Sequence, residues 1–553
     1  MRIRPICSFL ICAAIGLVLV GNDTAQTTIR QQSDLASPAY LPGQVIVDPG
    51  HPQWLKRQGG GHLFMCGPGD PEGFLYRGQR NTDGARDGDQ MAVINKLARH
   101  GGNALYLIAV RTPGGDAWKD KRDNPAVYPD DLHNPWLDQD PKKGLNEAIL
   151  RQWETWFAEM DRQQIIIYFF FYDDAIDVAK RFGWALDTRG ELHPEEKRFV
   201  QSIVNRFEHH KNLIWCVMEE AQEIGAHWQR HISKIAAAIR EADDHDHAIA
   251  SHQLAGNTFF HAGDPNIDQF AIQTHDLSVR TRPAFHDWLV EAWRNAAGRY
   301  NLNMSEDPLH RELCQNGDRA GLRQRNWAAA MAGAYVMVLG MDGAETPIEW
   351  LEDCRRLQQF FESTDFYRMQ PADELKREET EFVLAAPGRS CIAYSAASKT
   401  SLGLKDLPAS DYDLRWYDCA TGQSVERTNV RLRAGEQHWP KPQGFSSEVA
   451  LYLRRRGSET DLPLAKTTTD GKAVASAKPN RPPAVKNKSY RTKANTPFDL
   501  QLTYVDPDGG PGPYTTTVIT QPRFGALSGA GNDLTYTPRR GYSGADRFTW
   551  KVN

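Results

Sequence analysis

Residues 213–220 read Leu-Ile-Trp-Cys-Val-Met-Glu-Glu, six apolar residues followed directly by two glutamates. A continuous apolar run of this length is typical of a strand that is buried on both faces, as in a parallel sheet covered by helices. A polar loop and an amphipathic stretch, His227–Ala242, come next, and a second apolar run, Ala248–Leu254, follows. This order predicts a strand–helix–strand unit with acidic side chains at the end of its first strand.

The same alternation continues on both sides of this unit, from Gly61 to Asp342. The candidate strands are His62–Gly67, Ala104–Val110, Ile165–Tyr172, Leu213–Met218, Ala248–Leu254, Phe270–Thr274, Tyr300–Ser305 and Tyr335–Gly340. Further amphipathic stretches between them include Glu195–His210, Ala284–Gly298 and Arg319–Ala334. Eight strands with intervening helices predict an α/β fold, a (β/α)8 TIM barrel over residues 50–370. A doubly wound open sheet is the alternative, but no GxGxxG motif follows an early strand.

The chain has 553 residues, of which 40% are hydrophobic and 24% charged. Such a chain can bury a sizeable core, which excludes a wholly disordered protein. The 65 Lys and Arg against 70 Asp and Glu give a formal charge of -5. This near balance argues against a nucleic-acid partner, which would need a basic surface. The 15 Trp residues provide flat faces on which weakly polar ligands stack.

Arg2 and Arg4 precede an apolar run from Ile6 to Gly21. A basic end before such a run predicts a signal peptide over residues 1–25, too short for a confident membrane span. Because Asp23 is a poor residue near a cleavage site, an uncleaved anchor is the alternative. We therefore expect a secreted, periplasmic or cell-surface protein.

The six cysteines beyond this segment form no CxxC pair, so the spacing supports neither a zinc ribbon nor a redox motif. Export permits disulfides, and Cys391 and Cys419 lie close enough in sequence to pair within one small domain. Free buried thiols are the alternative.

The pattern changes near Glu374. Short strands broken by Gly, Pro and Asp turns follow, namely Phe382–Ala386, Ser390–Tyr394, Tyr412–Tyr417 and Val449–Leu453. They predict a small antiparallel β-domain over residues 374–456. Residues 457–483 are rich in Thr, Ala, Lys and Pro and are typical of an exposed linker. Residues 484–553 alternate polar and apolar side chains, which predicts a β-sandwich module.

Two of the eight predicted strands end in glutamate: Glu219 and Glu220 follow the fourth, and Glu306 ends the seventh. Reactive groups of a (β/α)8 barrel lie at the carboxyl ends of its strands. Two carboxyl groups about 5 Å apart suit retaining cleavage of a glycosidic bond, one as acid and one as nucleophile. Strand parity predicts that Glu220 and Glu306 point inward and that Glu219 turns toward a neighbouring loop or helix. Salt bridges or helix caps are the alternative roles.

Other polar groups are expected at the same rim, where they could bind sugar hydroxyls. Asp70 follows the first strand, His275 the sixth and Asp342 the eighth, with helix caps and loop salt bridges as the alternative. The long loop 111–144 carries Trp118 and Trp136, whose faces could stack on a sugar ring. A self-packed loop is the alternative there.

The run Asp243-Asp244-His245-Asp246-His247 contains an HxH pattern that metal-dependent hydrolases use. It precedes the fifth strand, so it belongs at the end of the barrel opposite the reactive rim, and we expect a solvated turn. No metal or other cofactor is therefore predicted for the barrel site.

Asn212–Glu220 together with Glu306 resembles the acid and nucleophile strands of the large clan of retaining (β/α)8 glycosidases. Arg99–Ala104 and Arg325–Ala334 are similar to the apiosidase-like glycoside hydrolases. A domain that these enzymes carry, named for collagen binding, resembles Phe382–Gly388 with Arg415-Trp416-Tyr417-Asp418 and Thr421-Gly422. The resemblance covers residues 50–456.

This resemblance implies that Glu220 is the acid/base and Glu306 the nucleophile. The chain departs from it at Glu219, where the clan has Asn and the narrower family often Gly. By the resemblance, Glu219 would bind the sugar 2-hydroxyl. The negative charge that it adds beside the acid favours the alternative in which the barrel binds a carbohydrate or a protein without catalysis. Glu219 as the acid, with Glu220 a bystander, also stays open.

In the last module, Asp506–Gly510 and Tyr536–Asp546 resemble bacterial cadherin-like or immunoglobulin-like repeats. Asp506, Asp508 and Asp546 offer oxygen ligands for Ca2+, and an Asp/Gly turn without an ion is the alternative. Such modules are spacers or attach a protein to a cell surface or matrix.

Taken together, the sequence predicts a secreted glycoside hydrolase that cleaves a polysaccharide or glycan by a retaining mechanism with two carboxylates. The alternatives are a non-catalytic carbohydrate- or protein-binding surface protein on a barrel scaffold, and a metal hydrolase.

Overall fold

The computed structural model describes residues 40–457 except 71–72, 112–132, 174–177, 225–226, 255 and 275–276. Its described C-terminal residues are 484–485, 492, 495–502, 504–505, 516–522, 524–530, 532–539 and 546–552. The predicted signal peptide and nearly all of the predicted linker lie outside these ranges.

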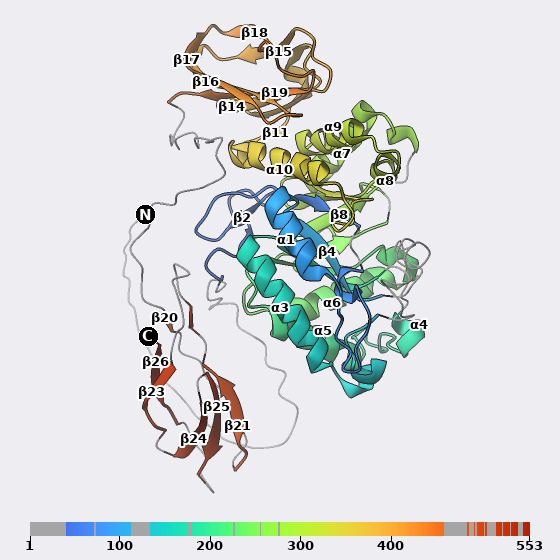
Figure 1. The fold of residues 1–553 in the computed structure, drawn as a ribbon, viewed down its shortest axis with the longest axis vertical. Coiled ribbons are helices and arrows are strands. Elements are labelled where there is room, and N and C mark those ends of the chain that lie inside the picture. The colour runs from blue at the N-terminus through green and yellow to red at the C-terminus, as the bar shows by residue number, and fades with distance from the viewer. Residues whose placement is uncertain are drawn as a thin grey trace, which may run out of the picture. The chain divides into compact units, whose positions relative to one another are not determined.

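The centre of the structure is a sheet of eight parallel strands in the order β3-β10-β9-β8-β7-β6-β5-β4 (Figure 1). The strands are β3 (Cys66–Pro68), β4 (Ala104–Val110), β5 (Ile166–Tyr172), β6 (Leu213–Met218), β7 (Ile249–His252), β8 (Gln269–Gln273), β9 (Asn301–Glu306) and β10 (Tyr335–Val338). All are buried along their whole length, as expected for strands covered on both faces. The predicted barrel strands are confirmed.

The two ends of this sheet, β3 and β4, meet and close the barrel. The backbone N–H of Asn103 donates to the carbonyl of Cys66 at 3.1 Å, and the Asn103 side chain accepts from the Cys66 N–H at 2.8 Å. A Cβ atom on Gly67 would lie 2.5 Å from the carbonyl oxygen of Ala104. Glycine at position 67 therefore allows the close approach of the two strands.

Amphipathic helices surround the barrel, and several carry a side-chain cap at their first turn. The helices are α1 (Gln90–His100), α3 (Glu147–Gln163), α4 (Val178–Phe182), α5 (Pro194–Phe207), α6 (Trp228–Ala242), α7 (Arg282–Ala296), α8 (Pro308–Gln315), α9 (Arg319–Met331) and α10 (Ile348–Glu362). For example, Asn146 accepts from the Ala148 N–H to start α3, and Asp307 accepts from the Leu309 N–H to start α8. No described helix is long and apolar enough to span a bilayer.

A short hairpin, β1 (Val45–Val47) and β2 (Leu55–Arg57), lies at the amino end of the barrel. The Val45 N–H donates to the carbonyl of Lys211, just before β6. His62 pairs with Lys56 in an antiparallel bridge, so it belongs to this hairpin. The first barrel strand therefore begins at Cys66, later than the predicted His62.

The β-domain that follows has a six-stranded antiparallel sheet, β11-β13-β14-β19-β16-β17, and a three-stranded one, β12-β15-β18. The strands are β11 (Gln370–Pro371), β12 (Lys376–Glu378), β13 (Phe382–Ala386), β14 (Ser390–Ser395), β15 (Ser401–Leu407), β16 (Ser410–Asp418), β17 (Ser424–Leu432), β18 (Gly435–Pro440) and β19 (Val449–Arg455). The predicted antiparallel fold is confirmed. Cys391 and Cys419 are separate buried thiols, and burial raises the pKa of Cys391 to about 12.

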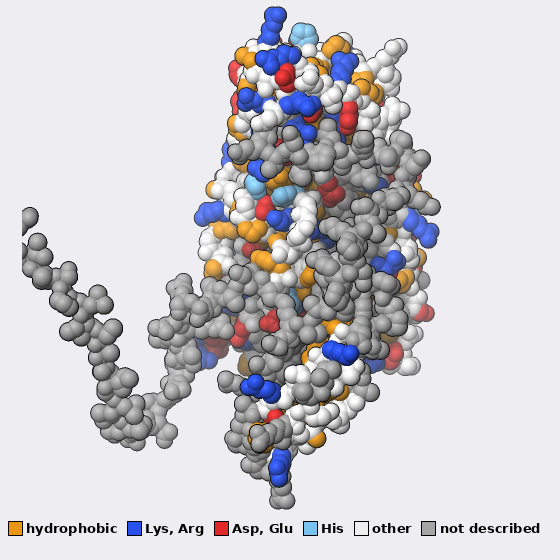
Figure 2. All heavy atoms as spheres, turned by 90° about the vertical axis from the view of Figure 1, so that its left-hand side faces the viewer, with side chains coloured by type: hydrophobic (Ala, Val, Ile, Leu, Met, Phe, Trp, Pro, Cys, Tyr) orange, Lys and Arg blue, Asp and Glu red, His pale blue; other side chains and the backbone are white. Residues whose placement is uncertain are grey.

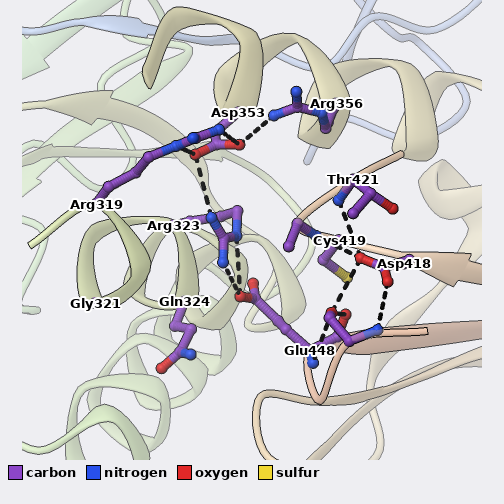
Figure 3. A network of polar contacts seen from close by, with 12 residues as sticks. Arg319, Gly321, Arg323, Gln324, Asp353, Arg356, Asp418, Cys419, Thr421 and Glu448 are labelled. Atoms are coloured by element: carbon purple, nitrogen blue, oxygen red, sulfur yellow. Dashed lines mark hydrogen bonds and ion pairs between the residues drawn. The ribbon is translucent and has the colours of Figure 1, made fainter. Parts of the chain in front are cut away.

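Charged side chains join the barrel helices to this β-domain (Figure 3). Arg323 of α9 lies 2.7 Å from Glu448, just before β19, and 3.3 Å from Asp353 of α10. The ring of Trp327 stacks on Tyr394 of β14, with 5.1 Å between centroids and 6° between planes. The contact thus combines buried aromatic packing with an ion-pair network.

The described C-terminal strands are also antiparallel. They are β20 (Ala484–Val485), β21 (Phe498–Gln501), β22 (Tyr504–Val505), β23 (Thr516–Thr520), β24 (Gly525–Ala530), β25 (Asp533–Pro538) and β26 (Thr549–Val552). Asp506 and Asp508, two of the predicted Ca2+ ligands, lie outside the described residues. Asp546 accepts hydrogen bonds from the Phe524 N–H at 2.8 Å and the Tyr536 hydroxyl at 2.9 Å.

Candidate active site

The carboxyl ends of β6, β7 and β9 bring three ionisable side chains together. One oxygen of Glu219, one ring nitrogen of His252 and one oxygen of Glu306 all lie within 4.8 Å of one another. All three residues are buried, with Glu219, His252 and Glu306 each 1% exposed. The structure thus brings Glu219 next to Glu306 at this mouth, whereas the predicted pair is Glu220 and Glu306.

His252 links the two glutamate-bearing strands. Its Nδ1 accepts from the Glu220 backbone N–H at 3.2 Å, so in the neutral ring the proton lies on Nε2. That Nε2 lies 2.7 Å from Ser305 Oγ and 3.5 Å from Glu306 Oε1. Burial lowers the pKa of His252 to about 3, which keeps the ring neutral. His252 therefore acts as a neutral donor toward the end of β9.

A second layer of hydrogen bonds holds the end of β9 from inside the barrel. The Tyr106 hydroxyl of β4 lies 2.6 Å from Ser305 Oγ and accepts from Asn303 Nδ2 at 2.8 Å. Burial raises the pKa of Tyr106, so the phenol stays protonated. The hydrogen bonds of Tyr106 therefore fix Asn303 and Ser305, the residues of β9 that precede Glu306.

Glu220 leaves the strand geometry, with a φ of 37° in the left-handed region. Its carboxylate accepts a hydrogen bond from Gln273 Nε2, and Gln273 is the register partner of Glu306. Because β6 ends at Met218, the alternation of the strand does not extend to Glu219. The expectation that Glu219 turns away from the mouth is wrong, since its carboxylate lies beside Glu306.

Two of the predicted rim residues have structural partners. Asp70 lies 3.7 Å from Arg311 of α8, as a loop ion pair. Asp342 accepts from the Glu345 and Thr346 backbone N–H groups at 2.9 and 3.1 Å and so caps the turn before α10. These are the alternative roles that the sequence left open.

The structure describes one of the two tryptophans that were predicted to stack on a sugar ring, Trp136. Trp136 is 1% exposed and packs edge-on against Phe182 at the end of α4, Trp184 after it and Phe199 of α5, so it anchors its loop to these helices. A platform role for Trp136 is therefore not what the structure has. Trp118 and His275 lie outside the described residues.

Sequence reasoning missed His252 and Gln273. They are the last residues of β7 and β8, but the predicted strands run on to Leu254 and Thr274, so the strand-end criterion used for the glutamates did not select them. It also missed Arg111 and Asp173, which follow β4 and β5 and lie 3.4 Å apart as a buried ion pair. Such a pair across neighbouring strand ends has no signature in sequence spacing.

The fold is similar to those of solved glycoside hydrolases. A glycoside hydrolase family 5 protein from Bacteroides vulgatus ATCC 8482 gives a TM-score of 0.55 at 11% identity, covering 76% of this chain and 95% of that chain. Another structure, described as a glycoside hydrolase, gives 0.53 at 13% identity, covering 76% and 99%. At these identities the likeness shows a shared fold.

A family model of the bacterial Ig domain matches residues 480–553, in agreement with the predicted C-terminal module. A sequence comparison with curated proteins gives no match.

Proposed function

We propose that this chain is a retaining glycoside hydrolase that cleaves a polysaccharide or glycan, with Glu306 as nucleophile and Glu220 as acid/base. The observation that carries the proposal is the convergence of glutamates from the ends of β6 and β9 at one barrel mouth. A Glu219 oxygen lies within 4.8 Å of a Glu306 oxygen, and the Glu220 carboxylate accepts from Gln273, the register partner of Glu306. The fold shared with glycoside hydrolases supports it.

In the first step, Glu220 donates its proton to the glycosidic oxygen while the Glu306 carboxylate forms a bond to the anomeric carbon. The bond between that carbon and the leaving oxygen breaks, which leaves a sugar ester on Glu306. In the second step, the Glu220 carboxylate takes a proton from water, the water oxygen attacks the anomeric carbon, and the ester bond breaks. No metal or cofactor enters either step.

Glu220 suits the acid role better than Glu219. It is 6% exposed, whereas Glu219 is 1% exposed, so Glu220 is the more accessible of the two. Its hydrogen bond from Gln273 fixes the carboxylate next to the strand that carries Glu306. Glu219 then flanks the nucleophile, where it would accept a hydrogen bond from a sugar hydroxyl.

His252 is a positioning residue in this scheme. Its neutral ring holds the backbone of Glu220 on one side and faces Ser305 and Glu306 on the other. A ring donor near Glu306 orients the carboxylate without supplying a full positive charge.

The proposal is tested with nitrophenyl and dinitrophenyl glycosides of several sugars. Glu306→Gln should lower turnover of every substrate by about 10⁴-fold or more, because the nucleophile is lost. Glu220→Gln should lower turnover of poor leaving groups by about 10²–10⁴-fold but spare dinitrophenyl glycosides, which need no acid. Glu345→Gln, an exposed change after β10, is the matched control and should keep wild-type turnover.

The same panel separates the other assignments. If Glu219→Gln gives the leaving-group pattern and Glu220→Gln does not, the acid is Glu219. A wild-type protein that binds glycans without turning over any substrate would support the non-catalytic alternative, which the extra charge of Glu219 favours.

The remaining features extend the proposal. The motifs near Arg99 and Arg325 support an apiosidase-like enzyme, with the β-domain as its partner domain named for collagen binding. The amino-terminal segment supports export, and the Ig-like module supports attachment to a cell surface or matrix. Ca2+ binding through Asp506, Asp508 and Asp546 is part of the same proposal.

A further inference from the structure

Three metal-type ligands converge at the amino end of the barrel, on the β1–β2 hairpin. Asp48 directly follows β1, His51 lies in the hairpin turn, and His62 lies on the segment that pairs back to Lys56. His51 Nδ1 and His62 Nε2 lie 2.8 and 2.7 Å from the same oxygen, Asp48 Oδ2. Together the three residues offer one ligand atom each within 4.8 Å.

We propose that Asp48, His51 and His62 form a binding site for a divalent transition-metal ion of the Zn2+ class. Two imidazoles and one carboxylate are ligands that zinc prefers, and three protein ligands leave a fourth position for water. The site lies apart from the glutamates of the carboxyl-end mouth and plays no part in the proposed hydrolysis.

The local structure holds two of the three ligands in place. The ring of His62 stacks on Tyr367 of the 3-10 turn η6 (Phe366–Arg368), with 3.5 Å between centroids and 7° between planes. Asp48 Oδ1 accepts from the Gly50 N–H at 3.1 Å and lies 3.8 Å from Lys56 Nζ. The other oxygen, Oδ2, is the one that faces both imidazoles.

Metal binding needs only a small opening of the cluster. Donor atoms around a tetrahedral Zn2+ at about 2.1 Å are about 3.4 Å apart, so the ligands must separate by roughly 0.6 Å. The side chain of His51 is 31% exposed and that of His62 is 15% exposed, so both imidazoles can be reached from solvent. On the face in Figure 2, histidine side chains reach the surface beside acidic and basic groups.

The test is calorimetric titration of tag-free full-length protein with zinc chloride, with Co2+ absorption as a second readout of coordination. We expect one Zn2+ per chain from this site, and at least about tenfold weaker affinity in His51→Ala, since a direct ligand is lost. Asp48→Asn keeps the shape of the side chain and should weaken binding as well, which covers the case that His51→Ala misfolds. Glycosidase turnover should not change in either variant.

Two matched controls assign the site. Glu154 with His209 and His210, and Glu219 with His252 and Glu306, are the other described clusters of this kind. His209→Ala and Glu306→Gln should keep wild-type zinc affinity. Absence of zinc binding in the wild type, or loss of binding in a control while His51→Ala keeps it, would overturn the proposal.

Discussion

At the scale of single residues, the neutral state of His252 has a consequence for stability. Its pKa is about 3 in the folded chain against an ordinary value of 6.5. Between these values the unfolded chain binds a proton that the folded chain excludes, so the free energy of unfolding falls as pH drops below 6.5. Above pH 6.5 this proton binding does not lower the free energy of unfolding. At pH 5 it lowers the free energy of unfolding by roughly 2 kcal/mol.

His252→Gln should therefore reduce the pH dependence of stability between pH 6.5 and 5, because glutamine does not titrate. Part of the dependence should stay, since burial also lowers the pKa of His310 to about 4. Urea unfolding at several pH values measures this slope. His438→Gln, at an exposed position of the β-domain, is the control and should keep the wild-type slope. An unchanged slope in His252→Gln would mean that His252 is not buried in its neutral form.

For single residues of the candidate site, the sequence predicts the position in a strand but not always the direction of the side chain. Glu219, Glu220 and Glu306 could be placed at strand ends because strand ends are readable from apolar runs. The direction of the Glu219 side chain could not be predicted, because strand parity holds only within the strand and β6 ends at Met218, one residue earlier. The end of a strand leaves no signal in hydrophobic periodicity for the residue that follows it.

At the scale of elements, the barrel depends on the contact between its first and second strands. Gly67→Ala would place a Cβ 2.5 Å from the carbonyl oxygen of Ala104, a backbone atom that cannot move aside alone. We expect a loss of about 1–3 kcal/mol in the free energy of unfolding, as for other overpacked sites.

Gly61→Ala is the matched control, because a Cβ there meets nothing within 4 Å. It should change stability by less than about 0.5 kcal/mol. Chemical denaturation of both variants measures the difference, and equal stabilities would show that β3 and β4 tolerate a wider spacing.

The strands of the barrel could be predicted from sequence because each is an apolar run buried on both faces. The boundary of the first strand could not, since His62 pairs with Lys56 through backbone hydrogen bonds that any residue can make. The role of Trp136 in its loop could not be predicted from the sequence either. Its aromatic ring reads equally well as a sugar platform or as a local core, and only tertiary packing decides.

At the scale of the whole molecule, the barrel and the β-domain share buried charge. Arg323 lies between Asp353 and Glu448, and the side chains of these three residues are at most 10% exposed. Removing one member of such a group leaves a buried charge without its partner, which costs more than the interaction itself contributes. Single substitutions in this interface should therefore lower the stability of the protein strongly, at positions that the sequence alone does not identify.

Arg323→Met should lower the free energy of unfolding by about 3–5 kcal/mol, because Glu448 loses its cation while the aliphatic packing is kept. If the network couples the two domains, calorimetry should resolve separate barrel and β-domain transitions in this variant where the wild type unfolds together. Arg431→Met is the control, since Arg431 is 75% exposed in its pair with Asp411 and should contribute at most about 1 kcal/mol. A loss in Arg323→Met no larger than in this control would show that aromatic packing around Trp327 alone holds the domains together.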